Sequence, residues 1–547
     1  MPRRDRYAGG LDRRRFLRGS AAAGLVGLGL GCRGRGMVLP ADAGVGAVAD
    51  DAGVGAPAIV TSTRARPSVP YGVQSGDIGA TSAVLWAASD RPARMLVELA
   101  TSDRFHDVRR IVGPAALIDT DFTAKLAVTA LPPGQDVFYR VTFQDLGDLS
   151  ALSEPVVGHL RTAPRERRSV RFLWSGDTCG QGWGIDPDRG GLGIYRAMRE
   201  RRPDFFIHCG DYVYADGPIA AAVPLSDGAV WRNLVLEGKH KVAETLAEFR
   251  ASYKYNLLDE HVRAFNAEVP QLVQWDDHET TNNWYPGERL DLDRTPYREP
   301  SVALLAARGQ RAFREWTPIL SPAHDPERIY RSFSYGPLVD VFMLDMRSYR
   351  GPNSPNRQPA SGPDTAFLGR AQLSWLKRGL AASRARWKVI AADMPIGLIV
   401  PDGRDHFEAV ANGGGPPLGR EHEIAELLAF IDGDDIDGVV WLTADVHYTA
   451  AHHYDPGKAR FTRFRPFWEF VSGPLHAGSF GPNPLDDTFG PEVRFQKAPG
   501  EGEINAAPNA GNTYFGEVDI DGASEAMTVT LRDGAGERLY SVELAPS

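Results

Sequence analysis

The side chains best suited to chemistry in this sequence are acids and histidines that follow directly after short apolar segments. Four segments have this pattern, ending in Ser175-Gly176-Asp177, Cys209-Gly210-Asp211, Trp275-Asp276-Asp277-His278-Glu279 and Thr443-Ala444-Asp445-Val446-His447. In open α/β sheets the loops at the carboxyl ends of the strands share one edge, where ligands bind. We therefore expect these side chains, although far apart in the sequence, to converge on one site.

Carboxylates gathered in one pocket repel each other strongly, so a site built from them must neutralise their charge. Two unit charges 4 Å apart interact by about 4 kcal/mol at an effective dielectric constant of about 20, so bound cations are the simplest remedy. Aspartate oxygens suit Ca²⁺, Mg²⁺ or Mn²⁺, and imidazole suits zinc and iron. Tyr214 follows Asp211 by three residues and offers a phenolate, a hard donor that fits ferric iron. A two-metal site with a bridging carboxylate would activate water and neutralise a transferring phosphoryl group.

Each of these residues also has a structural explanation when it is taken alone. A strand-terminal aspartate is often a helix N-cap, Tyr214 could be a packed aromatic, and His278 or His447 could be satisfied core histidines. The recurrence of the pattern in four segments favours the metal site.

Further residues are candidates for contact with ligands or substrate. Asn282 and Asn283 could orient them, although asparagine pairs usually form turns. Arg347 could clamp a phosphate or pair internally with Asp345. His476, in Ser472-Gly473-Pro474-Leu475-His476, could reach the pocket or belong only to a loop.

The region that carries these residues alternates between apolar strands and helices. Predicted strands run over 171–175, 205–207, 269–275, 339–344, 387–392 and 439–443, with helices over 192–201, 370–382 and 421–430, and closing strands over 515–520, 527–531 and 540–544. Continuous apolar strands alternating with helices indicate an α/β core with covered sheets.

Short strands separated by turn residues precede this core. Segments 83–86, 95–99 and 137–143 have this form, and Pro132-Pro133-Gly134 is one of the breaks. The pattern predicts a small β-sandwich, and residues 131–141 resemble the fibronectin type III pattern. We place this domain at residues 67–163 and the catalytic domain at residues 168–547.

The first residues have the form of an export signal. Charged residues 12–18, with paired arginines before Phe16-Leu17, precede a small apolar run over 21–31. This arrangement indicates the twin-arginine route; the alternative is an Arg-rich tail before a short helix. We predict a signal over 1–32, a disordered linker over 33–66 and a protein in the periplasm, at the cell surface or outside the cell. Ordinary cleavage is favoured over a lipid anchor at Cys32.

Composition excludes several other classes. A net charge of −9 argues against a specific nucleic-acid reader or an anionic membrane surface. No stretch reaches the roughly 20 apolar residues that span a bilayer. Only Cys179 and Cys209 follow the signal, which is no disulfide scaffold. The sequence lacks a Gly-x-Ser-x-Gly elbow, a His-Glu-x-x-His motif and a phosphate-binding Gly-x-x-x-x-Gly-Lys-Ser/Thr loop.

The blocks together resemble the alkaline phosphatase D (PhoD-like) family of calcineurin-like metallophosphoesterases over nearly the full length. The residues that carry the resemblance are Gly72-Val73-Gln74-Ser75-Gly76-Asp77, Gly210-Asp211-Tyr212-Val213-Tyr214, Trp275-Asp276-Asp277-His278-Glu279 and Leu442-Thr443-Ala444-Asp445-Val446-His447. The resemblance implies a two-sheet αββα sandwich core behind the N-terminal β-sandwich. It also implies an alkaline phosphatase or phosphodiesterase that hydrolyses phosphate mono- and diesters with a metal-bound hydroxide.

The resemblance also implies a role for each site residue. Ferric iron would be held by Asp177, Asp211, Tyr214 and His447, with Asp211 bridging to a second, Ca²⁺-like metal held by Asp277 and Asp445; Mn²⁺ and Zn²⁺ are the alternative metals. His278 would protonate the leaving oxygen. Some family members carry a Cys ligand, so Cys179 could bind iron, pair with Cys209 or, as we favour, do neither. Asp393 stands where many relatives place a further histidine.

Two alternative functions fit the same residues. One is a phospholipase D-like diesterase acting on lipid head groups, and the other is a non-catalytic metal-binding surface protein. His278 argues against the second, because a storage site needs no general acid beside its metals.

Overall fold

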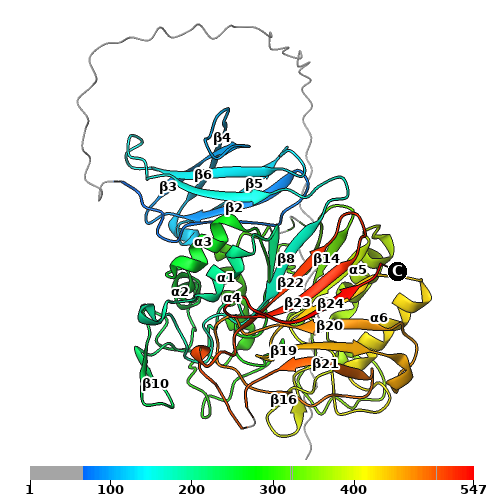
Figure 1. The fold of residues 1–547 in the computed structure, drawn as a ribbon. Coiled ribbons are helices and arrows are strands. Elements are labelled where there is room, and N and C mark those ends of the chain that lie inside the picture. The colour runs from blue at the N-terminus through cyan, green and yellow to red at the C-terminus, as the bar shows by residue number, and fades with distance from the viewer. Residues whose placement is uncertain (1–65, 321, 323, 501, 547) are drawn as a thin grey trace, which may run out of the picture. The chain divides into compact units, whose positions relative to one another are not determined.

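The computed structural model describes residues 66–320, 322, 324–500 and 502–546 (Figure 1). The predicted export signal, Cys32 and nearly all of the predicted linker lie outside the described residues. Within the described part, no helix combines the length and the apolar character that a bilayer crossing requires.

One sheet of nine strands forms the first layer of the core. Its order is β24 (Arg538–Leu544), β23 (Met527–Asp533), β22 (Tyr514–Ile520), β8 (Val170–Ser175), β9 (Phe205–Cys209), β12 (Gln271–Gln274), β1 (Val73–Gly76), β2 (Ser82–Ala88) and β5 (Thr123–Thr129). Strands β8, β9, β12 and β1 are parallel, and the outer strands pair antiparallel. The predicted closing strands are thus found at one edge of this sheet.

A second sheet of seven strands faces the first. Its order is β13 (Arg331–Ser334), β14 (Val339–Met343), β15 (Trp387–Ala391), β18 (Val439–Thr443), β20 (Phe467–Val471), β19 (Thr449–Tyr454) and β21 (Pro491–Lys497). The central strands β14, β15, β18 and β20 are parallel. Both sheets therefore send the carboxyl ends of parallel strands to one edge of the core.

The two sheets pack on each other through alternate residues of their strands. Phe172 and Trp174 of β8 join one buried cluster with Val341 and Val389 of the second sheet. Leu173, which points the other way, packs under the helices on the outer face. Because both faces of the central parallel strands are covered, these strands are mostly apolar and buried, whereas the edge strands β13, β21 and β24 are partly exposed.

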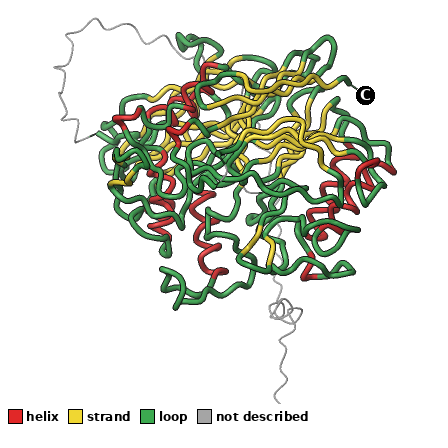
Figure 2. The backbone as a smooth tube through the Cα atoms, turned by 60° about the horizontal axis from the view of Figure 1, so that its bottom comes forward, coloured by secondary structure: helices red, strands yellow, loops and turns green. Residues whose placement is uncertain are grey.

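Helices cover the two outer faces. The first sheet carries α1 (Ile194–Glu200), α2 (Leu246–Asn256), α3 (Glu260–Glu268) and α4 (Val302–Trp316), and the second carries α5 (Gly369–Ala382) and α6 (Glu421–Gly433). Figure 2 shows the strands gathered in the middle with helices at either side. A capping box formed by Thr245 and Glu248 fixes the start of α2. The predicted αββα arrangement is confirmed.

The N-terminal β-sandwich is built onto this core. Its four-stranded sheet contains β4 (Arg109–Ala116), β3 (Ala93–Ala100), β6 (Asp136–Asp145) and β7 (Val156–Arg161), and it packs against β1, β2 and β5. Those three strands belong to the nine-stranded sheet, since Gly76 of β1 pairs with Gln271 of β12. Trp86 of β2 also packs on Trp316 of α4. The predicted sandwich therefore shares a sheet with the catalytic core, and its boundary at residues 163–168 stays a prediction.

Two short hairpins complete the described strands. They are formed by β10 (Ala222–Pro224) with β11 (Val230–Arg232) and by β16 (Pro401–Asp402) with β17 (His406–Phe407).

Contact between β22 and β8 predicts a stability effect at Gly516. A Cβ at Gly516 would overlap the ring of Trp174 on the paired strand, so Gly516→Ala should lower the free energy of unfolding by about 1–3 kcal/mol. Gly433→Ala is the matched control, because nothing lies within 4 Å of the added atom at the end of α6. Urea unfolding of both variants checks this, and equal effects would contradict the packing argument.

Candidate metal and catalytic centre

The predicted acids lie at the carboxyl ends of parallel strands from both sheets. Asp177 follows β8, Asp211 follows β9, Asp277 follows β12 and Asp445 follows β18. Three of them, Asp177, Asp211 and Asp445, have left-handed backbones with φ of 67°, 52° and 66°. A non-glycine residue in this region costs about 1–3 kcal/mol and persists only where the surrounding fold imposes it. The loops therefore turn sharply where each carboxylate is presented.

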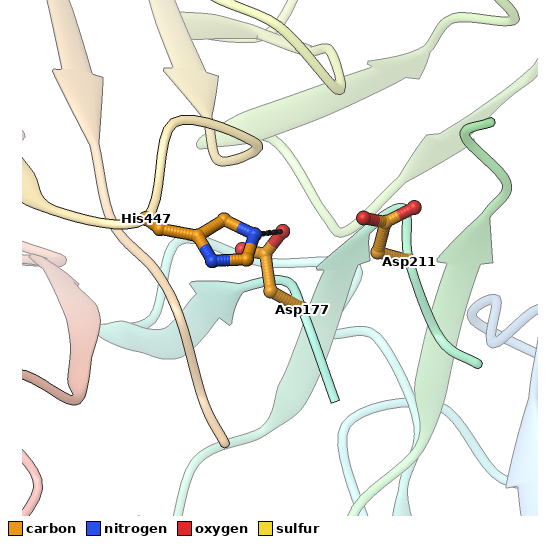
Figure 3. Close-up of side chains that lie close together, drawn as sticks. All are labelled: Asp177, Asp211 and His447. Atoms are coloured by element: carbon orange, nitrogen blue, oxygen red, sulfur yellow. Dashed lines mark ion pairs between the residues drawn. The ribbon is translucent and has the colours of Figure 1, made fainter. Parts of the chain in front are cut away.

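Asp177, Tyr214 and His447 meet on one side of the site. His447 Nε2 lies 3.1 Å from Asp177 Oδ1 and 2.8 Å from the Tyr214 hydroxyl. Because a carbonyl only accepts, His447 Nδ1 donates to the Gly478 carbonyl, and Nε2 is the ring nitrogen that faces Asp177 and Tyr214. Figure 3 shows Asp177 and His447 in contact with Asp211 beside them. These groups offer oxygen, phenol and imidazole donors to one point.

Three overlapping groups of donors follow from this arrangement. They are Asp177 with Asp211 and His447, Asp211 with Asp277 and His278, and Asp276 with Asp277 and Asp445; within each group the donor atoms lie within 4.8 Å of one another. Asp211 and Asp277 each belong to two groups. Such sharing is what a site for neighbouring metal ions requires.

The carboxylates have unpartnered buried oxygens and raised pKa values, and bound cations would account for both. Asp177 Oδ2 and Asp277 Oδ1 are buried and have no hydrogen-bond partner among the described residues. Burial raises the pKa of Asp211 well above its usual range, and the neighbouring Asp277 and Asp276 raise it further. Burial likewise raises the pKa of the Tyr214 phenol, with Asp211 and Asp177 adding to the effect. A cation among these groups would reverse each shift and satisfy the buried oxygens.

Arg347 is the main protein cation behind the acids. It is fully buried and its guanidinium contacts Asp276 and Glu408, while Asp277 lies 3.7 Å away. Burial opposes ionisation of Asp276, yet the charge of Arg347 keeps the Asp276 pKa below its usual value. Two roles were considered for Arg347, a phosphate clamp and an ion pair with Asp345. The guanidinium is instead buried and pairs with Asp276 and Glu408. Asp345 accepts instead from the Arg347 backbone N–H at 3.1 Å.

Glu279 joins two of the strand-end loops. Its carboxylate is fully buried and accepts hydrogen bonds from the backbone N–H groups of Tyr212 at 2.5 Å and Asp276 at 2.7 Å. The loop after β9 is therefore fixed against the loop after β12.

His278 is held by an acid that the sequence analysis missed. Its Nδ1 lies 2.8 Å from each carboxylate oxygen of Asp216, which also accepts from the Asn282 backbone N–H at 2.7 Å. Burial alone would lower the His278 pKa, but the carboxylates of Asp216 and Asp277 raise it to about 10. His278 Nε2 then points toward Asp211, 4.0 Å from Oδ2. Asp216 shares the loop of Asp211 and Tyr214, which is the one sequence signal that could have indicated it.

A cavity of about 620 Å³ opens onto these groups. Of the predicted residues it is lined by Asp211, Asp277, His278, Asn282, Asn283, Asp445 and His447. Glu408 and Asp402, which the sequence analysis did not select, also line it.

Five predicted residues do not line this cavity: the proposed ligands Asp177 and Tyr214, and the further candidates Arg347, His476 and Cys179. Arg347 is buried behind the acids, as described above. His476 directs Nε2 to the Gly184 carbonyl at 3.0 Å and packs on Trp231, which matches the loop alternative. Cys179 is buried, and neither it nor Cys209 forms a disulfide within the described residues. Burial raises the pKa of the Cys179 thiol above its usual range, which disfavours the thiolate.

Known proteins share this fold and sequence pattern. The family model described as PhoD-like phosphatase matches residues 172–531, and that of the PhoD-like phosphatase N-terminal domain matches residues 54–164. Alkaline phosphatase D of Bacillus subtilis (strain 168) is 27% identical over 452 residues, covering 77% of this chain and 72% of that protein.

Solved structures agree. A PhoD structure matches with a TM-score of 0.64 at 21% identity, covering 87% of this chain and 89% of the other. The purple acid phosphatase PPD1 from yellow lupin (Lupinus luteus) matches with a TM-score of 0.52 at 13% identity, covering 88% and 74%. The family resemblance found in the sequence is thereby confirmed: the chain belongs to the PhoD-like phosphatase family and is a phosphoric ester hydrolase.

Proposed function

We propose that this protein is an exported phosphatase and phosphodiesterase whose chemistry depends on a metal pair between the two sheets. The observation that carries the proposal is the sharing of Asp211 and Asp277 among three donor groups at the wall of one cavity. When bound, such metals activate water and neutralise the charge of the transferring phosphoryl group. Export through the twin-arginine route is part of the proposal and rests on residues 1–32.

The donor chemistry supports different metals on the two sides. Asp177, Tyr214 and His447 would hold ferric iron together with Asp211, because a phenol buried among carboxylates ionises only beside a strongly charged cation. Asp277 and Asp445 offer oxygen alone, which suits Ca²⁺. Mn²⁺ or Zn²⁺ are the alternatives.

Other residues of the chain would position the carboxylates and supply the proton for the leaving group. Asn283 donates its backbone N–H to Asp277 Oδ2 at 2.5 Å and so fixes that carboxylate. His278 carries a proton held by Asp216 on Nδ1, and its Nε2 faces the site. We assign His278 as the general acid that protonates the leaving oxygen.

Removal of the shared carboxylate tests the metal site. Asp211→Asn should reduce the bound metal and lower the turnover of p-nitrophenyl phosphate and bis(p-nitrophenyl) phosphate by at least about 10³-fold, because metal stabilisation of a phosphoryl transition state is worth several kcal/mol. Elemental analysis and steady-state kinetics measure both effects. Asp136→Asn, on the β-sandwich, is the control and should change neither. Full activity in Asp211→Asn would rule out the shared role, and a wild-type protein inert with iron and calcium would end the proposal.

Substitution of Asp216 tests whether His278 acts as the general acid. Asp216→Asn should keep the metals and slow turnover by about 10- to 100-fold, within the range of acid–base contributions. The loss should be greater for an alkyl phosphate than for p-nitrophenyl phosphate, since the poorer leaving group depends more on protonation. Equal losses for both substrates, or loss of metal, would contradict this assignment.

Metal removal should change how stability depends on pH. Burial and neighbouring acids raise the pKa of Asp211 and Asp445 in the folded, metal-free chain. Above about pH 4 the folded state then binds more protons than the unfolded state, so its free energy of unfolding falls as pH rises, by about 1.4 kcal/mol per unit of pKa difference. Thermal unfolding should show that the melting temperature is lower with chelator than without it, and that this difference grows from pH 5 to pH 8. A difference in melting temperature that does not change with pH would contradict the argument that the metals stabilise the fold by neutralising these acids.

A further inference from the structure

The cavity wall is unusual for a site that binds phosphate because, among the described residues that line it, none is lysine or arginine. Its titratable members are the acids Asp211, Asp277, Asp402, Glu408 and Asp445, besides His278 and His447. Metal ions would neutralise the reacting phosphoryl group. Apart from His278, whose Nδ1 is held by Asp216, no lysine or arginine side chain among the described lining residues could pair with a second anionic group on the substrate, which would instead meet carboxylates.

Asp402 is the acid placed to meet such a group. It is the last residue of β16, beside the turn of the β16–β17 hairpin, and is partly exposed. Its Oδ1 accepts from Asn283 Nδ2 at 3.1 Å and its Oδ2 from Asn353 Nδ2 at 2.9 Å. Within the described chain no basic side chain forms an ion pair with it; both oxygens accept from neutral amides, and the buried Arg420 acts on its charge only from a distance.

Asn283 sets the distance between this charge and the reacting centre. The same residue donates its backbone N–H to Asp277 Oδ2 and its side-chain amide to Asp402 Oδ1. A single residue therefore separates a carboxylate of the metal cluster from the carboxylate of Asp402. The second substituent of a phosphodiester bound at the cluster would therefore reach Asp402 by extending past Asn283.

Part of the cavity wall is apolar. Val400, Pro401, Phe480, Pro482 and Pro484 line the cavity there, and the Phe480 ring stacks on His447 with centroids 4.6 Å apart. Carbon-rich substituents can pack on this surface, and an aromatic face also attracts cations.

We propose, on the basis of the proposed function, that Asp402 is a specificity-determining residue that selects by charge. The protein prefers phosphodiesters whose second alcohol is uncharged or cationic and disfavours those whose second alcohol carries another anionic group.

Three p-nitrophenyl phosphodiesters that share a leaving group test this selection. Their second alcohols are 2-(trimethylammonio)ethyl, ethyl and 2-carboxyethyl. The metal-loaded wild type should give kcat/KM values that fall in this order. Asp402→Asn should reduce the ratio between the first and the third by roughly tenfold, the size expected for one charge at the rim, with the ethyl ester little changed. Added salt should also lower the wild-type ratio.

Two matched variants separate charge from structure. Asp405→Asn removes an acid from the same hairpin that does not line the cavity, and it should leave the ratio unchanged. Asp402→Glu keeps the charge and should keep the order. An unchanged ratio in Asp402→Asn, an equal change in Asp405→Asn, or a wild type indifferent to the three esters would overturn the inference while leaving diester hydrolysis intact. A wild type that cleaves none of them would refute the proposed diesterase function itself, and this inference with it.

Discussion

The carboxylates of Asp276, Asp277 and Glu408 surround one buried guanidinium, that of Arg347, and this charge balance governs the rest of the site. Even with the protonated His278 and the buried Arg350, which also acts on Glu408 and Asp276, Arg347 does not offset these acids together with Asp211 and Asp445, whose pKa values are raised by burial and by their neighbours. Removing a charge from water costs several kcal/mol unless it is paired. The fold therefore keeps a deficit of positive charge at one edge, and metal ions are the species that can fill it.

Holding acids together against their repulsion requires a rigid frame. The frame is the pair of sheets, whose inner faces pack through large buried side chains such as Trp174 and Phe470. Their parallel strands end at one edge, and the residues that follow adopt left-handed backbones at Asp177, Asp211 and Asp445. Each such backbone is unfavourable by itself. The packing energy of the core offsets this local cost, so stability in the sheets and strain at the site are parts of one arrangement.

The sequence revealed the acids at the strand ends because continuous apolar segments make the ends of buried strands visible. The same signal predicted covered sheets, whereas the two-sheet arrangement followed from the family resemblance and the sandwich from short strands separated by turn residues. The sequence could not reveal Asp216, Asp402 or Glu408, which lie in loops or in a two-residue strand without periodicity and acquire a role only through distant partners such as His278 and Asn283. Nor could it show that β1 pairs with β12, because a strand's pattern records its burial and not the identity of its neighbour. Arg347 was noticed, but its partners are set by tertiary contact.

Asn283 shows why catalysis and selectivity are difficult to separate in such a site. Its backbone fixes a carboxylate of the metal cluster, while its side chain fixes the acid at the cavity rim. Asn353 supports the same rim acid and also donates to the Asn283 carbonyl at 2.8 Å. Loss of the Asn283 side chain would therefore leave Asp402 held by Asn353 alone without removing any proposed metal ligand, whereas movement of the Asn283 backbone would disturb both carboxylates. The negative charge that makes metals necessary at the centre thus extends, through one residue, to the wall that a substrate's second substituent must pass.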